Sequence, residues 1–144
     1  MIRYVLLIAV FFLSVDLTAQ DWKQSYNEAL EQANTEDKPL ILVFSGSDWC
    51  PPCKRLQKNI WSSEKFKSYS SQKYVLYNAD FPRKKGNQLS PELVSQNKEL
   101  AEKYNPKNHF PLVLVLDKSE KVLGTTGYKK MSPEEYISVL NSFL

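Results

Sequence analysis

Two runs of apolar residues constrain the fold of this chain more than any other feature. LILVF spans residues 40–44 and LVLVL spans residues 112–116, and neither run contains a polar side chain. Short continuous apolar runs are typical of strands that are buried on both faces of a sheet. Residues 73–80 alternate and are rich in aromatic and branched side chains, and residues 122–128 form a weaker strand candidate. We therefore expect a sheet of about four strands.

The segments between these strands have helical patterns. Apolar residues at helical spacing predict a helix over residues 22–34, and a second helix that begins at the cysteine pair and runs to about Trp61. A short helical piece is expected over residues 62–69. Ser90 and Ser132, each followed by proline and glutamate, predict two further helix starts. Helices alternating with apolar strands predict an α/β fold with a mixed central sheet flanked by helices on both faces.

The chain has only two cysteines, Cys50 and Cys53, and two prolines separate them. A disulfide between these cysteines would close a very small loop. Because the stabilisation from a disulfide grows with the length of the loop that it closes, this bond would add little to the stability of the fold. We therefore interpret the pair as reactive rather than structural.

The amino-terminal residues have the layout of a secretory signal peptide. Arg3 precedes an apolar run over residues 5–15, and polar and small residues follow as far as Ala19. The run is too short for a membrane span, which needs about 20 residues. We expect residues 1–19 to be a cleaved signal peptide and residues 20–144 to form one domain. An uncleaved membrane anchor is the alternative, because the cleavage site is imperfect. Either arrangement places the domain outside the cytoplasm, in the periplasm or its equivalent, where thiols tend to form disulfides.

The charge of the chain argues against a nucleic-acid partner. The formal net charge is +3, from 19 Lys and Arg against 16 Asp and Glu, and the two signs are interleaved along the sequence. The densest cationic run is Arg83, Lys84 and Lys85, which we interpret as a polar loop. We expect no nucleic-acid partner and a monomeric protein.

Three segments resemble thioredoxin-fold proteins. LILVFSGSDWCPPCKRL, residues 40–56, resembles their junction of strand, tryptophan and CxxC helix. HFPLVLVLD, residues 109–117, resembles the stretch that carries their cis-proline, and VLGTTGY with the last helix resembles their closing hairpin and helix. Residues 80–105 are similar to an insert of exported bacterial thioredoxin-like proteins. The resemblance covers residues 38–144 and implies a thioredoxin fold.

The resemblance also implies roles for individual residues. Cys50 would be the nucleophile, Cys53 the resolving thiol, and Pro111 a cis-proline that faces both. A sulfur at a helix N-terminus meets unpaired backbone amides and the positive end of the helix dipole, which lower a cysteine pKa from about 8.5. Further residues are expected to support the site or to contact substrate: Trp49, Pro51, Pro52 and Phe110.

Several positions leave alternatives open. Thioredoxins carry a buried aspartate six residues before the first cysteine, and that position is Phe44 here. The proton acceptor would then be water, Asp48 or another group. Lys54 and Arg55 either add positive charge to the site or point to solvent. His109, the only histidine, either tunes the nucleophile or is a surface loop residue.

The leading functional hypothesis is an exported thiol–disulfide oxidoreductase that acts on cysteines of other exported proteins. A reductase or isomerase is favoured over an oxidase, because no histidine between the cysteines stabilises the thiolate. A reductase in an oxidising compartment needs recharging, for which we expect a membrane electron-transfer partner. We expect no cofactor besides the cysteine couple, and no resident metal, because the chain lacks a second CxxC for a zinc site. One alternative is a copper(I) carrier using Cys50, Cys53 and His109. Another is a binding module that presents Trp49 and Phe110 to a peptide.

Overall fold

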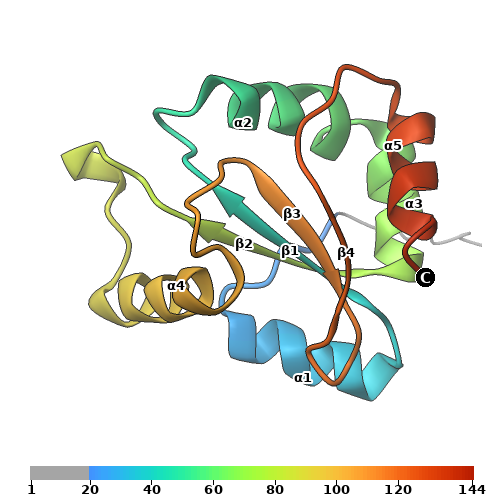
Figure 1. Cartoon of the computed structure of the whole chain (residues 1–144), viewed down its shortest axis with the longest axis horizontal. Helices are drawn as coiled ribbons and strands as arrows, with labels where there is room; N and C mark the ends of the chain where they lie inside the picture. The colour runs from blue at the N-terminus through green and yellow to red at the C-terminus, as the bar shows by residue number, and fades with distance from the viewer. Residues whose placement is uncertain (1–19) are drawn as a thin grey trace, which may run out of the picture.

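A four-stranded mixed sheet with the strand order β2-β1-β3-β4 lies at the centre of the protein (Figure 1). The computed structural model describes residues 20–144, so the expected signal peptide lies outside the described residues. β1 (Leu40–Ser45) pairs in parallel with β2 (Val75–Asp80) and antiparallel with β3 (Leu112–Leu116). β4 (Val122–Thr126) pairs antiparallel with β3. The expected sheet is confirmed.

Helices cover both faces of this sheet (Figure 1). One face carries α2 (Pro51–Leu56), the short π-helix η1 (Gln57–Trp61), α3 (Glu64–Lys73) and α5 (Pro133–Asn141). The other face carries α1 (Tyr26–Glu36) and α4 (Pro91–Tyr104). A single 3₁₀ turn, η2 (Lys85–Asn87), lies in the loop between β2 and α4. Within residues 20–144, no helix combines the length and the apolar character needed to cross a bilayer.

The residues of β1 divide the core into two layers. Successive side chains of a strand point to opposite faces. Ile41 and Val43 pack with the apolar side chains of α2, α3 and α5, whereas Leu40, Leu42 and Phe44 pack with those of α1 and α4. Every residue of β1 is buried. Burial on both faces is why this strand is a continuous apolar run.

Serine caps set the starts of the later helices. The Ser90 hydroxyl accepts the Leu93 amide at the start of α4. At α5 the Ser132 hydroxyl accepts the Glu135 amide, and the Glu135 carboxylate accepts the Ser132 amide, which completes a capping box. Both expected starts are confirmed.

The helix expected over residues 22–34 is wrong at both ends. Trp22 forms an isolated parallel bridge with Leu76, and the Lys23 amide donates to the Leu76 carbonyl, so this segment extends the edge of the sheet. The Ser25 hydroxyl then accepts the Glu28 amide, and α1 starts at the next residue and runs on to Glu36. Sheet pairing overrides the helical spacing of the first apolar residues.

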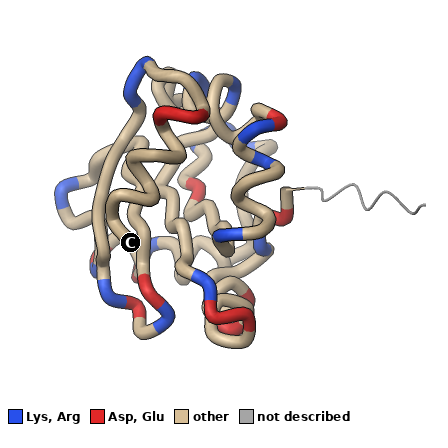
Figure 2. Tube along the Cα trace, turned by 90° about the vertical axis from the view of Figure 1, so that its right-hand side faces the viewer, with Lys and Arg blue, Asp and Glu red and all other residues tan. Residues whose placement is uncertain are grey.

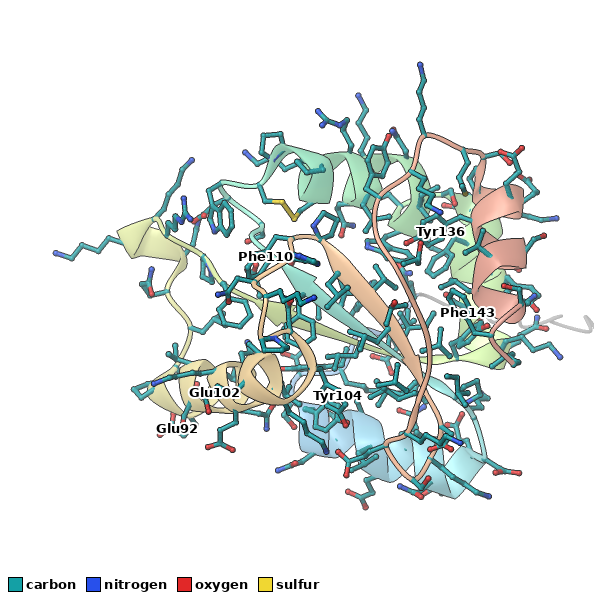
Figure 3. The ribbon with its side chains drawn as sticks, in the orientation of Figure 1. Glu92, Glu102, Tyr104, Phe110, Tyr136 and Phe143 are labelled. Atoms are coloured by element: carbon teal, nitrogen blue, oxygen red, sulfur yellow. A yellow bond between two sulfur atoms is a disulfide. The ribbon has the colours of Figure 1, made fainter. Side chains whose placement is uncertain are left out.

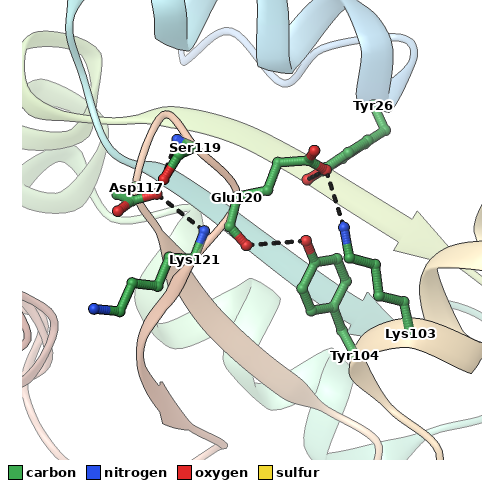
Figure 4. Close-up of polar contacts among 7 residues, drawn as sticks. All are labelled: Tyr26, Lys103, Tyr104, Asp117, Ser119, Glu120 and Lys121. Carbon is green, nitrogen blue, oxygen red and sulfur yellow. Dashed lines mark hydrogen bonds and ion pairs between the residues drawn. The ribbon is translucent and has the colours of Figure 1, made fainter.

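The turn between β3 and β4 is tied to α1 and α4 by the side chain and backbone of Glu120 (Figure 4). The Tyr26 hydroxyl donates to the Glu120 carboxylate at 2.9 Å, and Lys103 lies 3.5 Å from the same oxygen. The Tyr104 hydroxyl donates to the Glu120 carbonyl at 3.1 Å. These contacts fix the end of the sheet that lies away from the cysteine pair (Figure 3).

Replacing Asn97 with alanine should destabilise the fold. The buried Asn97 side chain accepts the Tyr77 hydroxyl at 2.6 Å and donates to the Asp80 carbonyl at 3.2 Å, so it joins α4 to β2. Its loss leaves two buried polar groups unpaired, which costs about 1–3 kcal/mol. Urea denaturation measures this, with the exposed neighbour Lys98→Ala as the control. Equal unfolding free energies for the two variants would contradict the prediction.

Candidate functional site

Cys50 and Cys53 form a disulfide where β1 ends and α2 begins (Figure 3). The S–S distance is 2.10 Å and the Cα atoms are 5.2 Å apart. Cys50 is the N-cap of α2, and its sulfur accepts the Cys53 amide at 3.3 Å. Pro51 and Pro52 occupy the first two helical positions, where a missing N–H leaves no hydrogen bond unmade. The sequence expectation of a cysteine pair at a strand–helix junction is therefore met.

A close contact beneath Trp49 explains the small residues before the cysteines. The amides of Trp49 and Cys50 both donate to the Gly46 carbonyl, which closes a tight turn. A β-carbon on Gly46 would lie 2.2 Å from the Trp49 ring. Only glycine leaves room for the indole at this position.

Trp49 is held from three sides by residues that are distant in sequence. Its indole N–H donates to the Phe81 carbonyl at 2.7 Å. The guanidinium carbon of Arg83 lies 3.7 Å from a Trp49 ring centroid, a cation–π contact. Phe110 meets the indole edge-on at 5.3 Å. Trp49 is therefore a fixed side chain that joins the cysteine loop to the loop after β2.

Asp48 fixes that same loop through its carboxylate. Its two oxygens accept the Arg83 amide at 2.9 Å, the Lys84 amide at 2.9 Å and the Asn87 side-chain amide at 3.1 Å. The hydrogen bond from the Arg83 amide, with the others, holds the pKa of the Asp48 carboxyl below its usual value. The carboxylate binds three groups of the loop after β2, so the geometry gives Asp48 a positioning role.

The segment before β3 brings Pro111 to the cysteine pair. The Phe110–Pro111 peptide bond is cis, and Pro111 lines the same cavity as Cys53. The buried Asn105 side chain accepts the His109 amide at 2.9 Å and donates to the His109 carbonyl at 2.8 Å. His109 is exposed, so its backbone is held in place while its side chain faces solvent.

A cavity of about 410 Å³ lies beside Cys53. Its walls combine apolar side chains, among them Val43 and Trp61, with the polar side chains of Ser45 and Asn78. A larger hollow of about 640 Å³ lies between α1 and α4, but no cysteine lines it. The cavity that Cys53 lines is therefore the one relevant to the chemistry of the cysteine pair.

Phe44 stands at the position where thioredoxins carry a buried acid, so this position supplies no proton acceptor. Phe44 packs on the α1 and α4 face, where it stacks on Phe81 at 6.4 Å, and it does not line the cavity. Because strand side chains alternate, its neighbours Val43 and Ser45 face the cysteine side instead. The polar residue that β1 offers to the cavity is therefore Ser45, one position after Phe44.

A polar network stands on the cysteine side of β1 and β2. The Ser45 hydroxyl lies 2.8 Å from the Asn78 side-chain oxygen and 3.3 Å from Asp80. The Asp80 carboxylate also accepts the amide of Ser47 at 2.9 Å and its hydroxyl. The parallel register places Ser45 beside Asp80. The Asp80 carboxylate is therefore linked to the cavity through the Ser45 hydroxyl.

The two cations after the cysteines are exposed. Lys54 lines the mouth of the cavity beside Cys53. The Arg55 guanidinium lies 5.8 Å from the Tyr128 ring centroid.

Within residues 20–144 no group of three or more His, Cys, Asp or Glu side chains is arranged to hold a metal ion. The structure therefore does not assemble Cys50, Cys53 and His109 as a copper-binding group.

Sequence reasoning missed several residues of the site. Their sequence signals are weak, because serine, asparagine and loop arginine are common surface residues. Long-range contacts, chiefly the pairing of β1 with β2, bring these residues to the cysteines. They are Ser45, Asn78, Asp80, Phe81, Arg83 and Asn105.

The fold and the site define a thioredoxin-fold protein with a CxxC disulfide. The model of a family described as thioredoxin-like matches residues 21–118, and the chain belongs to this family. It is 34% identical over 121 residues to the disulfide bond reductase DsbH of Chlamydia pneumoniae, covering 84% of this chain and 71% of that protein.

Two further comparisons agree with this assignment. A solved structure of a DsbH oxidoreductase superposes with a TM-score of 0.81 at 33% identity, covering 88% of this chain and 85% of that one. The thioredoxin-related protein DsbJ of Chlamydia pneumoniae is 27% identical over 106 residues, which is 74% of this chain and 30% of DsbJ. The match to DsbJ therefore concerns a minor part of that protein.

The loop after β2 should loosen when Asp48 is protonated. The pKa of the Asp48 carboxyl is lower in the folded protein than in the unfolded chain, where it is about 3.9. The ionised carboxylate therefore orders the loop above about pH 3.9, and this order is lost as the pH falls through the lower pKa of the folded state. In NMR spectra, the amide signals of Arg83 and Lys84 should titrate together below about pH 3.9. The Asp48→Asn variant should lack this titration. Amide shifts that follow an ordinary aspartate midpoint would contradict the prediction.

Proposed function

We propose that this thioredoxin-like thiol–disulfide oxidoreductase reduces or isomerises disulfide bonds of other exported proteins. The observation that carries the proposal is the Cys50–Cys53 disulfide at the start of α2, next to Pro111, in a chain that is similar to DsbH in sequence and in structure. The name of DsbH describes a disulfide bond reductase, and this supports reduction as the direction of exchange.

The reaction transfers two electrons from the cysteine pair to a substrate disulfide. In the reduced protein the Cys50 thiolate attacks one substrate sulfur, the substrate S–S bond breaks, and one substrate thiolate leaves. A mixed disulfide then joins Cys50 to the substrate. Cys53 loses its proton and attacks the Cys50 sulfur, which forms the intramolecular disulfide and releases the second substrate thiolate. The substrate ends as two thiols and the protein ends oxidised.

The position of Cys50 favours its thiolate. Its sulfur already accepts the Cys53 amide, and a hydrogen bond of this kind stabilises an anion more than a neutral thiol. The start of α2 adds the positive end of a helix dipole. Cys53 lies inside the helix, and the cavity beside it is the direction in which its proton can leave.

In this proposal, the Ser45 hydroxyl and the Asp80 carboxylate together accept the proton of the Cys53 thiol. Ser45 lines the cavity with Cys53, and its hydroxyl lies within hydrogen-bond distance of the Asp80 carboxylate. A proton from the Cys53 thiol would pass to Ser45, directly or through a water molecule in the cavity, while Ser45 gives its own proton to Asp80. Asp48 is unsuited to this step because its carboxylate binds Arg83, Lys84 and Asn87, none of which lines the cavity.

The location and partners follow from the same chemistry. Residues 1–19 have the layout of a signal peptide, and export would bring the domain to substrates whose cysteines oxidise. Each turnover leaves the Cys50–Cys53 disulfide, so continued reduction needs an electron donor. We place that donor in the membrane, because the cytoplasmic reductant pool lies on its other side.

Substituting the cysteines one at a time should separate the two chemical steps. Cys50→Ser should abolish insulin reduction in the presence of a chemical reductant, because no nucleophile remains. Cys53→Ser should instead accumulate a mixed disulfide with the substrate, because nothing resolves it. Turbidity measures the first effect and a non-reducing gel the second. A Cys50→Ser variant that reduces insulin at the wild-type rate would remove the proposal, and a double variant that keeps its biological role would favour a binding module.

Ser45→Ala and Asp80→Asn should slow the second step. We expect the resolution of the mixed disulfide to fall by about tenfold or more, since a positioned proton acceptor typically contributes at least that much. The rate of Cys50 alkylation in the reduced protein should change much less. Stopped-flow release of a fluorescent thiol substrate measures resolution separately from attack. If Asp48→Asn slows resolution and Asp80→Asn does not, Asp48 is the acceptor and the assignment is wrong.

A further inference from the structure

Six exposed cations lie on the two segments that flank the reactive disulfide. We call this set the cationic rim, and all of its members are solvent-exposed. They come from two segments that are distant in sequence, α2 with η1 and the loop after β2. The rim consists of Lys54, Arg55, Lys58, Arg83, Lys84 and Lys85.

Each half of the rim has members at the site, which are Lys54 and Lys58 on one segment and Arg83 on the other. Lys54 and Lys58 line the cavity that Cys53 and Pro111 also line. On the other side, the Arg83 guanidinium lies on the Trp49 ring, and Trp49 precedes Cys50. Asp48 holds the Arg83 and Lys84 backbone in this position. The loop after β2 is therefore fixed at the site.

None of the rim cations forms an ion pair within the part of the chain that the structure describes. Within residues 20–144, the ion pairs belong to Lys23, Lys38, Lys67, Lys103 and Lys118, and none includes a rim residue. The two carboxylates close to the rim, Asp48 and Asp80, have their oxygens engaged by amides and hydroxyls.

The distribution of charge is uneven as a result. The six rim cations and the two nearby carboxylates together carry a formal charge of +4, which exceeds the formal net charge of +3 of the whole chain. Away from the rim, Lys or Arg and Asp or Glu are interleaved, as the lower edge of the molecule in Figure 2 shows. Positive potential is therefore concentrated around the disulfide.

We propose that the cationic rim docks acidic polypeptide segments, so that the protein prefers disulfides flanked by Asp or Glu. This inference rests on the proposed exchange function and names its substrate class. Unpaired charges around a reactive centre attract oppositely charged partners and raise their association rate. A polypeptide is favoured over a membrane surface because rim residues lie next to a disulfide and next to the aromatic pair of Trp49 and Phe110, which a peptide chain can contact.

The test uses three synthetic peptides that share one intramolecular disulfide and differ only in flanking residues, Glu, Gln or Lys. The rate constant for their reduction by the pre-reduced protein is measured at low and high salt. We expect the Glu peptide to react about tenfold faster than the Gln peptide at low salt, and the Lys peptide to react slowest. The ratio should approach one at about 0.5 M salt, because screening removes the attraction.

Charge reversal locates the effect. Lys84→Glu with Lys85→Glu should abolish the preference for the Glu peptide. The control, Lys73→Glu with Lys121→Glu, makes the same change in net charge at exposed positions next to the starts of β2 and β4, and it should keep the preference. The rate of Cys50 alkylation is measured in each variant, so that a changed thiol is not mistaken for changed docking.

Three results would overturn the inference. They are a Glu-to-Gln ratio near one in the wild-type protein, a ratio that persists at high salt, and a control that loses the preference as fully as the rim variant. Rim-dependent binding to phosphatidylglycerol vesicles without any peptide preference would assign the rim to a membrane surface instead. Failure to reduce even the Gln peptide would reject the proposed function itself, which separates the two conclusions.

Discussion

The parallel pairing of β1 with β2 is the interaction on which the site depends. Its register places Ser45 beside Asp80 and Val43 beside Asn78, so the polar network forms on the face that α2 covers. The Phe81 amide continues the pairing by donating to the Ser45 carbonyl at 2.9 Å. As a result, the loop with the cysteines and the loop after β2 leave the sheet side by side. A shift of one residue would turn both network side chains to the opposite face.

Burial and capping made most of the fold predictable from sequence. β1 from Leu40 to Phe44 and β3 throughout are apolar because both of their faces are covered, and the caps at Ser90 and Ser132 are local signals that depend on a few adjacent residues. The start of α1 was not predictable, since the bridge of Trp22 to Leu76 is a long-range pairing. Helical spacing cannot detect a partner that lies far along the chain.

The candidate site shows the same division between local and long-range information. The cysteine pair and its place at a strand–helix junction follow from adjacent residues, and the identity of the pair needs no knowledge of the fold. Residues that are distant in sequence form the environment of the pair. Arg83 packs on Trp49, and Asp80 lies near Ser45. Phe44, at the position of the thioredoxin acid, packs on the face away from the cavity, and strand pairing supplies Asp80 beside Ser45 on the cavity side.

The two aspartates near the disulfide have separate tasks in this arrangement. Asp48 is fully engaged by the loop after β2, and the loop in turn positions Arg83 over Trp49. Asp80 lies on the inner side, next to the cavity network, and its bonds to Ser47 keep it there. Because hydrogen bonds within the protein engage both carboxylates, neither forms an ion pair with the surrounding lysines and arginines. The interactions that build the site therefore also leave its positive charge available to a partner.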